Sequence, residues 1–140
     1  MMGRQSSQME IAIVDLGEMV PKTHLLKKIE SLVDFSFIYE KAENLYSSQG
    51  RPSIDPVLLI KMLLIGYLFG IKSERRLEDE VSLNLAYRWF CGLGLSGKVP
   101  DHSTFSQNRR RRFRDSSLFE DVFIAILESC IENGLADGEI

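Results

Sequence analysis

The chain has 140 residues, a formal net charge of −3, 44% hydrophobic and 26% charged residues, and four prolines. This length suits one domain with a sizeable core, and the composition excludes a disordered or a fibrous protein. These totals say nothing specific about function.

The first 20 residues are predicted to form an N-terminal arm. Apolar residues alternate in part between positions 9 and 20, which favours a short strand or an extended arm. The segment contains one arginine and no apolar stretch longer than four residues before Asp15, so it lacks the apolar core of a signal peptide. We therefore expect a cytoplasmic protein.

Helical spacing of apolar residues predicts two short amphipathic helices in 22–35 and 36–47. "SQGRPSID" then reads as a loop, and Pro56 suits a first helical turn that Asp55 or Ser53 can cap. The run "VLLIKMLLIGYLFGI" (57–71) is apolar nearly all round. It has 15 residues and includes Lys61, whereas a membrane span needs about 20, so we expect a central buried helix and no membrane partner.

The segment 72–90 reads as a charged helix that Ser73 can cap, followed by a shorter aromatic one. In the latter, "YRWF" mixes rings with arginine, as surfaces that stack on nucleobases do, but the area that such rings bury favours the core. On the charged helix, Arg75 and Arg76 either contact DNA phosphates or pair with the acidic residues four positions further on. The sequence leaves both interpretations open.

The residues that often bind metals form no recognisable site. Cys91 and Cys130 lie in apolar segments without a C-x-x-C pattern, which predicts buried free thiols. His24 and His102 are far apart and lack the spacing of a zinc site, and we expect His102 to lie beside a helix start. We predict no metal and no cofactor for this chain.

A basic helix is predicted from "PDHSTFSQNRRRRFRD" (100–115), beginning at Asp101 or Ser103. Residues 98–114 carry six basic and one acidic side chain, whereas 115–140 carry seven acidic and no basic ones. Opposite charge blocks can neutralise each other, form two solvated faces, or present a basic patch to phosphates. Charge alone does not choose between these three.

The helical period assigns the two sides of this basic helix. At about 100° per residue, Phe105 and Phe113 mark the inward side, with Arg109 between them and Arg112 on its flank. Arginine attracts phosphates and can bond guanine in two places, and glutamine can do the same to adenine. The opposite side, which we call the outer stripe, consists of Ser103, Gln107, Arg110, Arg111 and Arg114.

The helices before the basic helix allow a helix-turn-helix arrangement, although the loop "GLGLSGKVPD" is longer than its tight turn. A last amphipathic helix is predicted from "SSLFEDVFIAILESCIENG", ending at Gly134. Its apolar side must pack on this domain or on a second copy. The predicted fold class is therefore all-α: a compact multi-helix domain with a helix-turn-helix-like DNA-binding part.

Four motifs, "GRPSIDPV", "SERRLEDEV", "NLAYRWF" and "PDHSTFSQNRRRRF", occur in an order and spacing that resemble a known family. Over residues 19–138 the chain is similar to the N-terminal domain of bacterial insertion-sequence transposases of the InsH-like type. The resemblance implies a helical domain that binds the terminal repeats of the element. It also implies a separate ribonuclease H-like domain, whose Asp, Asp and Glu residues bind two divalent metal ions.

The resemblance places the first catalytic aspartate of such transposases shortly after a stretch like "ENGLADGEI", with which this chain ends. We therefore expect a truncated protein without catalytic residues or enzyme activity of its own, and we assign neither Asp137 nor Glu139 as catalytic. The expected organisation is an arm (1–20), a DNA-binding domain (21–115) and an amphipathic helix (116–140) leading toward the absent domain.

Two functions follow as hypotheses. In the first, the chain binds DNA through the outer stripe, together with Arg109, Arg75 and Arg76. In the second, it is an interaction module that forms dimers with itself or with full-length transposase through the last helix, and so acts as an inhibitor. A decayed remnant without a selected role is a third, weaker possibility.

Overall fold

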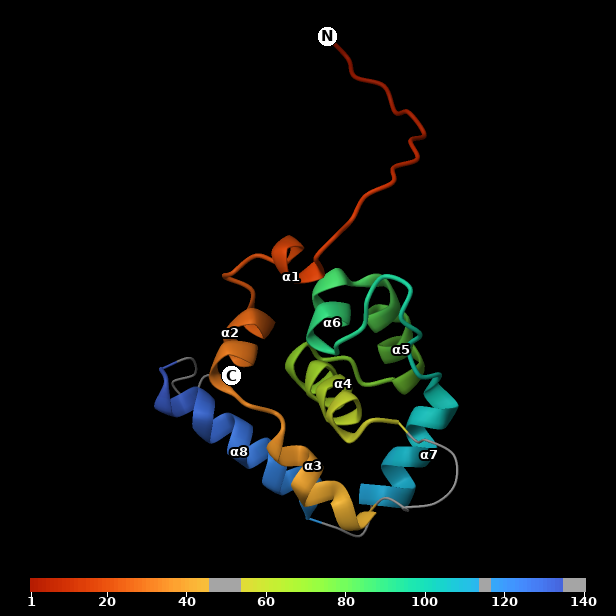
Figure 1. The fold of residues 1–140 in the computed structure, drawn as a ribbon. Coiled ribbons are helices and arrows are strands. Elements are labelled where there is room, and N and C mark those ends of the chain that lie inside the picture. Colours follow the sequence, from red (N-terminus) through yellow and green to blue (C-terminus); the bar gives the residue numbers. More distant parts are fainter. Residues whose placement is uncertain (46–53, 114–116, 135–140) are drawn as a thin grey trace.

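The computed structural model describes residues 1–45, 54–113 and 117–134, with side chains except at 45, 111–113 and 118. All regular elements in these ranges are helices, which confirms the predicted all-α class (Figure 1). None of the described helices is both long and apolar enough to cross a membrane. The helices are α1 (Leu16–Met19), α2 (Leu25–Leu32), α3 (Phe37–Ala42), a 3-10 turn η1 (Glu43–Leu45), α4 (Pro56–Leu68), α5 (Glu74–Leu83), α6 (Leu85–Phe90), α7 (His102–Phe113) and α8 (Leu118–Glu132).

Helix α4 is the buried helix that the sequence predicts, and the other helices surround it (Figure 1). Asp55 caps it, since its Oδ1 accepts a hydrogen bond from the Val57 N–H at 2.7 Å, and Pro56 occupies the first turn. Gly70 follows the helix with φ 69°, and the Ile71 N–H donates back to the Gly66 carbonyl. This left-handed position favours glycine and turns the chain toward α5.

One charged residue is buried in α4. The Lys61 side chain is 11% exposed, and its Nζ donates to the Glu30 carboxylate of α2 at 2.9 Å. The same ammonium lies 4.6 Å from the centre of the Phe35 ring and 4.8 Å from that of Phe90. The residue that interrupts the apolar run therefore joins α2 to α4 inside a partly aromatic environment.

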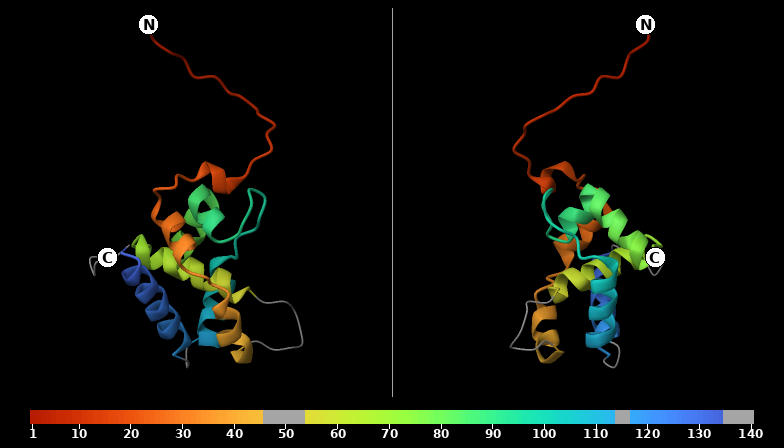
Figure 2. Two further views of the ribbon diagram at one scale, coloured as in Figure 1. Left: turned by 60° about the vertical axis from the view of Figure 1, so that its left-hand side comes forward. Right: turned by 90° about the vertical axis from the view of Figure 1, so that its right-hand side faces the viewer.

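The predicted N-terminal arm contains a short helix, and the alternative of a strand within it is wrong. Asp15 caps α1 by accepting from the Gly17 N–H at 2.9 Å, and α1 packs against α6. Before this helix, residues 1–14 have no helix or strand and extend away from the other helices (Figure 2). Among the described residues, no strand lies beside this segment to pair with it. Below, the word arm means residues 1–14, a shorter segment than the arm of residues 1–20 that the sequence predicts.

Helix α8 packs on this domain rather than standing free. It contacts α2 and α3, and its inward residues Val122, Ile126 and Cys130 are buried (Figure 1). Gly134 follows its end with φ 71°, as the sequence predicts. Ile124 and Ile131 remain more than half exposed on the outer side.

The aromatic helix α6 belongs to the core, as predicted. Tyr87 and Phe90 are buried, while Arg88 donates from Nε to the Ser82 carbonyl at 2.8 Å. Its Nη1 reaches the carbonyls of Gly94 and Gly97 at 2.7 and 2.8 Å. Arg88 therefore fixes the loop that leads to α7 and is not available for stacking on nucleobases.

Both cysteines are buried free thiols, which confirms the prediction from their apolar surroundings. Burial raises the pKa of the Cys91 thiol to about 12, so this residue is neutral and unreactive at ordinary pH.

Candidate nucleic-acid interface

The basic helix begins where the sequence predicts. Asp101 precedes it and accepts hydrogen bonds from the Thr104 N–H and hydroxyl, both at 2.9 Å. These bonds hold the pKa of Asp101 below its ordinary value. Four residues further on, Phe105 is 1% exposed and anchors the inward side of α7. The other predicted anchor, Phe113, has a side chain outside the described part.

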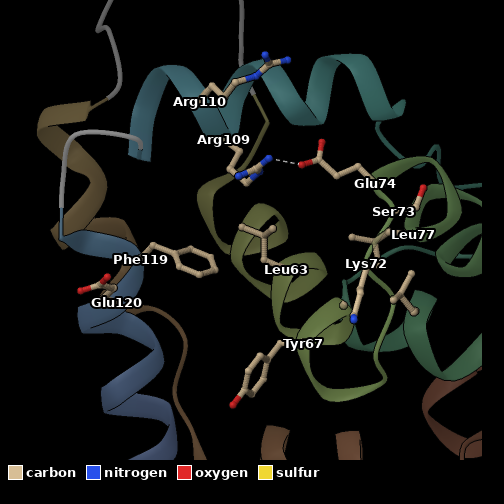
Figure 3. Close-up of a pocket in the computed structure, with 12 residues that line it drawn as sticks. Leu63, Tyr67, Lys72, Ser73, Glu74, Leu77, Arg109, Arg110, Phe119 and Glu120 are labelled. Atoms are coloured by element: carbon tan, nitrogen blue, oxygen red, sulfur yellow. Dashed lines mark hydrogen bonds and ion pairs between the residues drawn. The ribbon is translucent and has the colours of Figure 1, made fainter.

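Two carboxylates of α5 attach α7 to the domain. Glu78 accepts from the backbone N–H of His102 at 2.7 Å, and its Oε1 lies 3.0 Å from the His102 Nδ1. One turn earlier, Glu74 forms an ion pair with Arg109 (Figure 3). The earlier residue of α5 thus meets the later residue of α7, so the two helices run antiparallel. We call Glu74 and Glu78 the carboxylate pair.

The contact at Glu78 predicts an acid-sensitive attachment of α7. The pKa of Glu78 is lowered from its ordinary 4.5, chiefly because the carboxylate accepts hydrogen bonds from the side chain and then from the backbone of His102. A carboxyl whose pKa falls on folding adds stability above its unfolded pKa and loses it as the pH falls through the folded value. We expect the melting temperature to fall below about pH 4.5, and less steeply in Glu78→Gln.

Thermal unfolding followed by circular dichroism between pH 3 and 7 measures this difference. Glu128→Gln, at an exposed position of α8, is the matched control and should keep the slope of the unchanged chain. Equal slopes in Glu78→Gln and the unchanged chain would contradict the role of Glu78.

The described part of the outer stripe is exposed to solvent. Ser103, Gln107 and Arg110 are all exposed, at spacings of four and three residues along α7. Arg110 points away from the ion pair of Arg109 and Glu74 (Figure 3). Arg111 continues the helix, but its side chain, like that of Arg112 and the whole of Arg114, lies outside the described part.

Arg109 differs from Arg110 because a carboxylate compensates its charge. The sequence predicts that it packs or forms a salt bridge on the phenylalanine side, and its pair with Glu74 confirms this. The partner lies on α5, however, and not on the acidic α8. Any phosphate at Arg109 would therefore have to compete with a carboxylate that is already in contact.

The first turn of α5 brings two further candidates close to α7. Arg76 pairs with Glu80 at 3.1 Å, as one of the two interpretations has it, whereas Arg75 forms no ion pair with any described residue. Because Glu74 contacts Arg109, both arginines lie near the second half of α7. The fold thus brings the first turn of α5, which carries these two arginines, next to α7.

Sequence reasoning missed the carboxylate pair. Glu74 and Glu78 are four residues apart on a charged helix, which is typical of an ordinary solvated face. Only the antiparallel packing of α5 and α7 shows what they bind. His102 was expected beside the helix start, and it is the first residue of α7.

A groove of about 800 Å³ opens between α4, α5, α7 and α8, below the basic helix (Figure 3). Leu63 and Tyr67 of α4 and Phe119 of α8 form part of its apolar lining. Lys72, Arg110 and Glu120 also line it. In the ranges that the structure describes, no three His, Cys, Asp or Glu side chains gather to hold a metal ion, here or elsewhere.

These features define the class of protein. It is an all-α domain in which the carboxylate pair holds the basic helix α7 and one side of α7 faces the solvent. The chain belongs to the family described as Transposase domain (DUF772), whose model matches residues 14–111, from the base of the arm into the second half of α7. No curated protein and no solved structure matches the chain. Membership in this family indicates a role in transposition.

Proposed function

We propose that this chain is the DNA-binding N-terminal part of a DDE-class transposase and recognises the ends of an insertion element through α7. The observation that carries the proposal is the two-sided character of α7. Phe105 is buried and the carboxylate pair fixes the inner side, while Ser103, Gln107 and Arg110 are exposed together. Family membership independently favours DNA as the partner.

The distribution of charge assigns different roles to the candidates. Arg110 and Arg111 are proposed to contact phosphates or guanine edges, with Gln107 and Ser103 beside them. Arg75 and Arg76 flank this region from α5 and would add phosphate contacts. We propose that α7 acts as the recognition helix of a helix-turn-helix-like unit with α5 and α6. DNA recognition, rather than strand cleavage, is the role proposed for these residues.

Joint replacement of Arg110 and Arg111 by alanine tests the proposal. The probe is a duplex enriched by the unchanged chain from a random-sequence pool, and fluorescence anisotropy measures its affinity between 50 and 200 mM salt. We expect the affinity to fall about tenfold or more, because arginine contacts to bases contribute about 1–3 kcal/mol each. The slope of log affinity against log salt should lessen by about 1.8 if both residues contact phosphates.

The matched control removes two positive charges from another side of the domain. Lys28→Ala with Lys41→Ala changes exposed lysines on α2 and α3 and should preserve affinity and salt slope. Equal losses in both double variants would show that only the total charge matters. Failure of the unchanged chain to enrich any duplex would overturn the proposal.

A further inference from the structure

The exposed side of α7 has a glutamine at its centre. Gln107 follows the buried Phe105 by two residues, which places it about 160° round the helix from that ring, almost opposite the core. Ser103 lies one turn before it and Arg110 one turn after it, and both are exposed as well. Gln107 therefore points away from the domain, in the middle of the described outer stripe.

The side-chain amide of Gln107 is available to a ligand. It is exposed and forms no hydrogen bond with any described residue. The next residue is the contrasting case, because the Asn108 Nδ2 donates to the Thr104 carbonyl of the same helix at 2.8 Å. Of two successive amides, Asn108 is thus held against its own helix, whereas Gln107 keeps both its donor and its acceptor.

The backbone that carries Gln107 is fixed on both sides of the helix start. The Phe105 ring is 1% exposed in the core, and the Glu78 carboxylate accepts from the backbone N–H of His102 at 2.7 Å. A side chain on a firmly seated helix is aimed before it meets its ligand, as recognition through two hydrogen bonds requires. Gln107 is therefore well placed to read a group of defined geometry.

Charge changes sign along α7. The carboxylates of Asp101 and Glu78 lie at its beginning, whereas Arg110 lies in its second half and forms no ion pair with any described residue. Carboxylates repel phosphates, so the first half of α7 is a poor surface for the DNA backbone, but base edges carry no net charge. The two halves of the exposed side therefore suit different parts of a duplex.

We propose that Gln107 reads an adenine in the major groove, while Arg110 binds a backbone phosphate. The Gln107 Oε1 accepts from the adenine N6 amino group and its Nε2 donates to adenine N7, the two bonds that an amide makes on this base edge. Gln107 is the sixth of the 12 residues of α7, and base contacts come from the N-terminal part of a recognition helix. This inference rests on the proposed function and adds which residue carries sequence specificity.

Base substitution in a bound duplex tests the assignment. The probe is the duplex that the unchanged chain enriches from a random-sequence pool, remade with each of the four base pairs at every position in turn. We expect one position where the unchanged chain prefers adenine by about five- to 150-fold and where Gln107→Ala binds all four base pairs within about twofold. The other positions should keep their preferences in the variant. Fluorescence anisotropy measures the affinities.

An altered base identifies the bonds themselves. Replacing that adenine by 7-deazaadenine removes the N7 acceptor, which should lower the affinity of the unchanged chain about two- to tenfold and leave that of Gln107→Ala unchanged. Asn108→Ala is the matched control, since its amide is held by the Thr104 carbonyl, and it should keep the adenine preference.

Arg110→Ala measures the phosphate contact separately. Its affinity should fall by the same factor for the enriched duplex and for a scrambled one, because a phosphate carries no sequence information. The slope of log affinity against log salt should lessen by about 0.9. Gln107→Ala should keep the slope of the unchanged chain, because a neutral amide releases no counterion.

Three results would overturn the assignment. They are a Gln107→Ala chain that keeps every base preference, an adenine preference that Asn108→Ala loses as well, and an Arg110→Ala chain with an altered preference at one base pair. In each case the unchanged chain still selects a duplex, so the proposed function stands while this inference fails. Failure to enrich any duplex is a different result, which overturns the proposed function and this inference with it.

Discussion

Replacing Phe105 with alanine is expected to lower the free energy of unfolding by about 3–5 kcal/mol. This ring is 1% exposed and is the described anchor of α7 in the core, where it shares one apolar cluster with Leu77 and Val81 of α5. Its removal leaves a cavity where α7 meets the core, and the ion pairs of Glu74 and Glu78 at the surface offset little of the loss. Urea denaturation followed by circular dichroism measures the loss.

Two controls separate packing from local effects on the helix. Phe105→Leu retains an apolar side chain and should cost about 1–2 kcal/mol, whereas Gln107→Ala on the exposed side should change stability by less than about 0.5 kcal/mol. If Phe105→Ala and Gln107→Ala had similar stabilities, α7 would not be seated as described, and the orientation of the outer stripe would be wrong.

Removing Glu30 is expected to be more damaging than removing its partner Lys61. Glu30→Ala leaves the ammonium of Lys61, whose side chain is only 11% exposed, without a carboxylate, and we expect a loss of about 2–3 kcal/mol. The rings of Phe35 and Phe90 offset part of this cost. Lys61→Met keeps the length of the side chain and should cost less than about 1 kcal/mol, because the Glu30 side chain is 38% exposed and regains water.

The double variant completes a thermodynamic cycle for this pair. With the lysine already replaced by methionine, Glu30→Ala should cost little, so that the double variant unfolds near the denaturant midpoint of Lys61→Met. Glu40→Ala, an exposed acidic residue of α3, is the control for loss of negative charge. Equal losses from Glu30→Ala and Lys61→Met would show that the buried ammonium does not depend on this carboxylate.

The inner side of α7 shows what pattern alone can predict. Helical periodicity placed Phe105 on the inward side and Arg109 beside it, for packing or a salt bridge, because residues three and four positions apart share a face in any α-helix. It named no partner for Arg109. The partner, Glu74, comes from a helix 35 residues away in the chain. Sequence spacing carries no information about such a contact.

The outer stripe remains a prediction from sequence for Arg111 and Arg114, which have no described side chains. The division into an arm, a DNA-binding domain and a last helix also stays a prediction, as does the helix-turn-helix arrangement. For Arg75 and Arg76 the sequence offered two equal interpretations. In the structure Arg76 pairs with Glu80 and Arg75 has no described ion pair, while contact of either residue with DNA stays a prediction.

By itself the sequence determined most of the local structure: the cap at Ser73, the buried apolar helix and the two sides of α7. It narrowed two further caps to a choice of two residues each, which the structure resolves as Asp55 and Asp101. These features depend on neighbours within about one turn, and local hydrogen bonding and side-chain period specify them. Only the tertiary structure decided that Lys61 pairs with Glu30 and that Glu74 and Glu78 of α5 bind α7. It also decided that no strand lies beside the arm among the described residues. Those outcomes depend on which helices pack together, because a charged or apolar side chain acquires its role only from the group that lies opposite it.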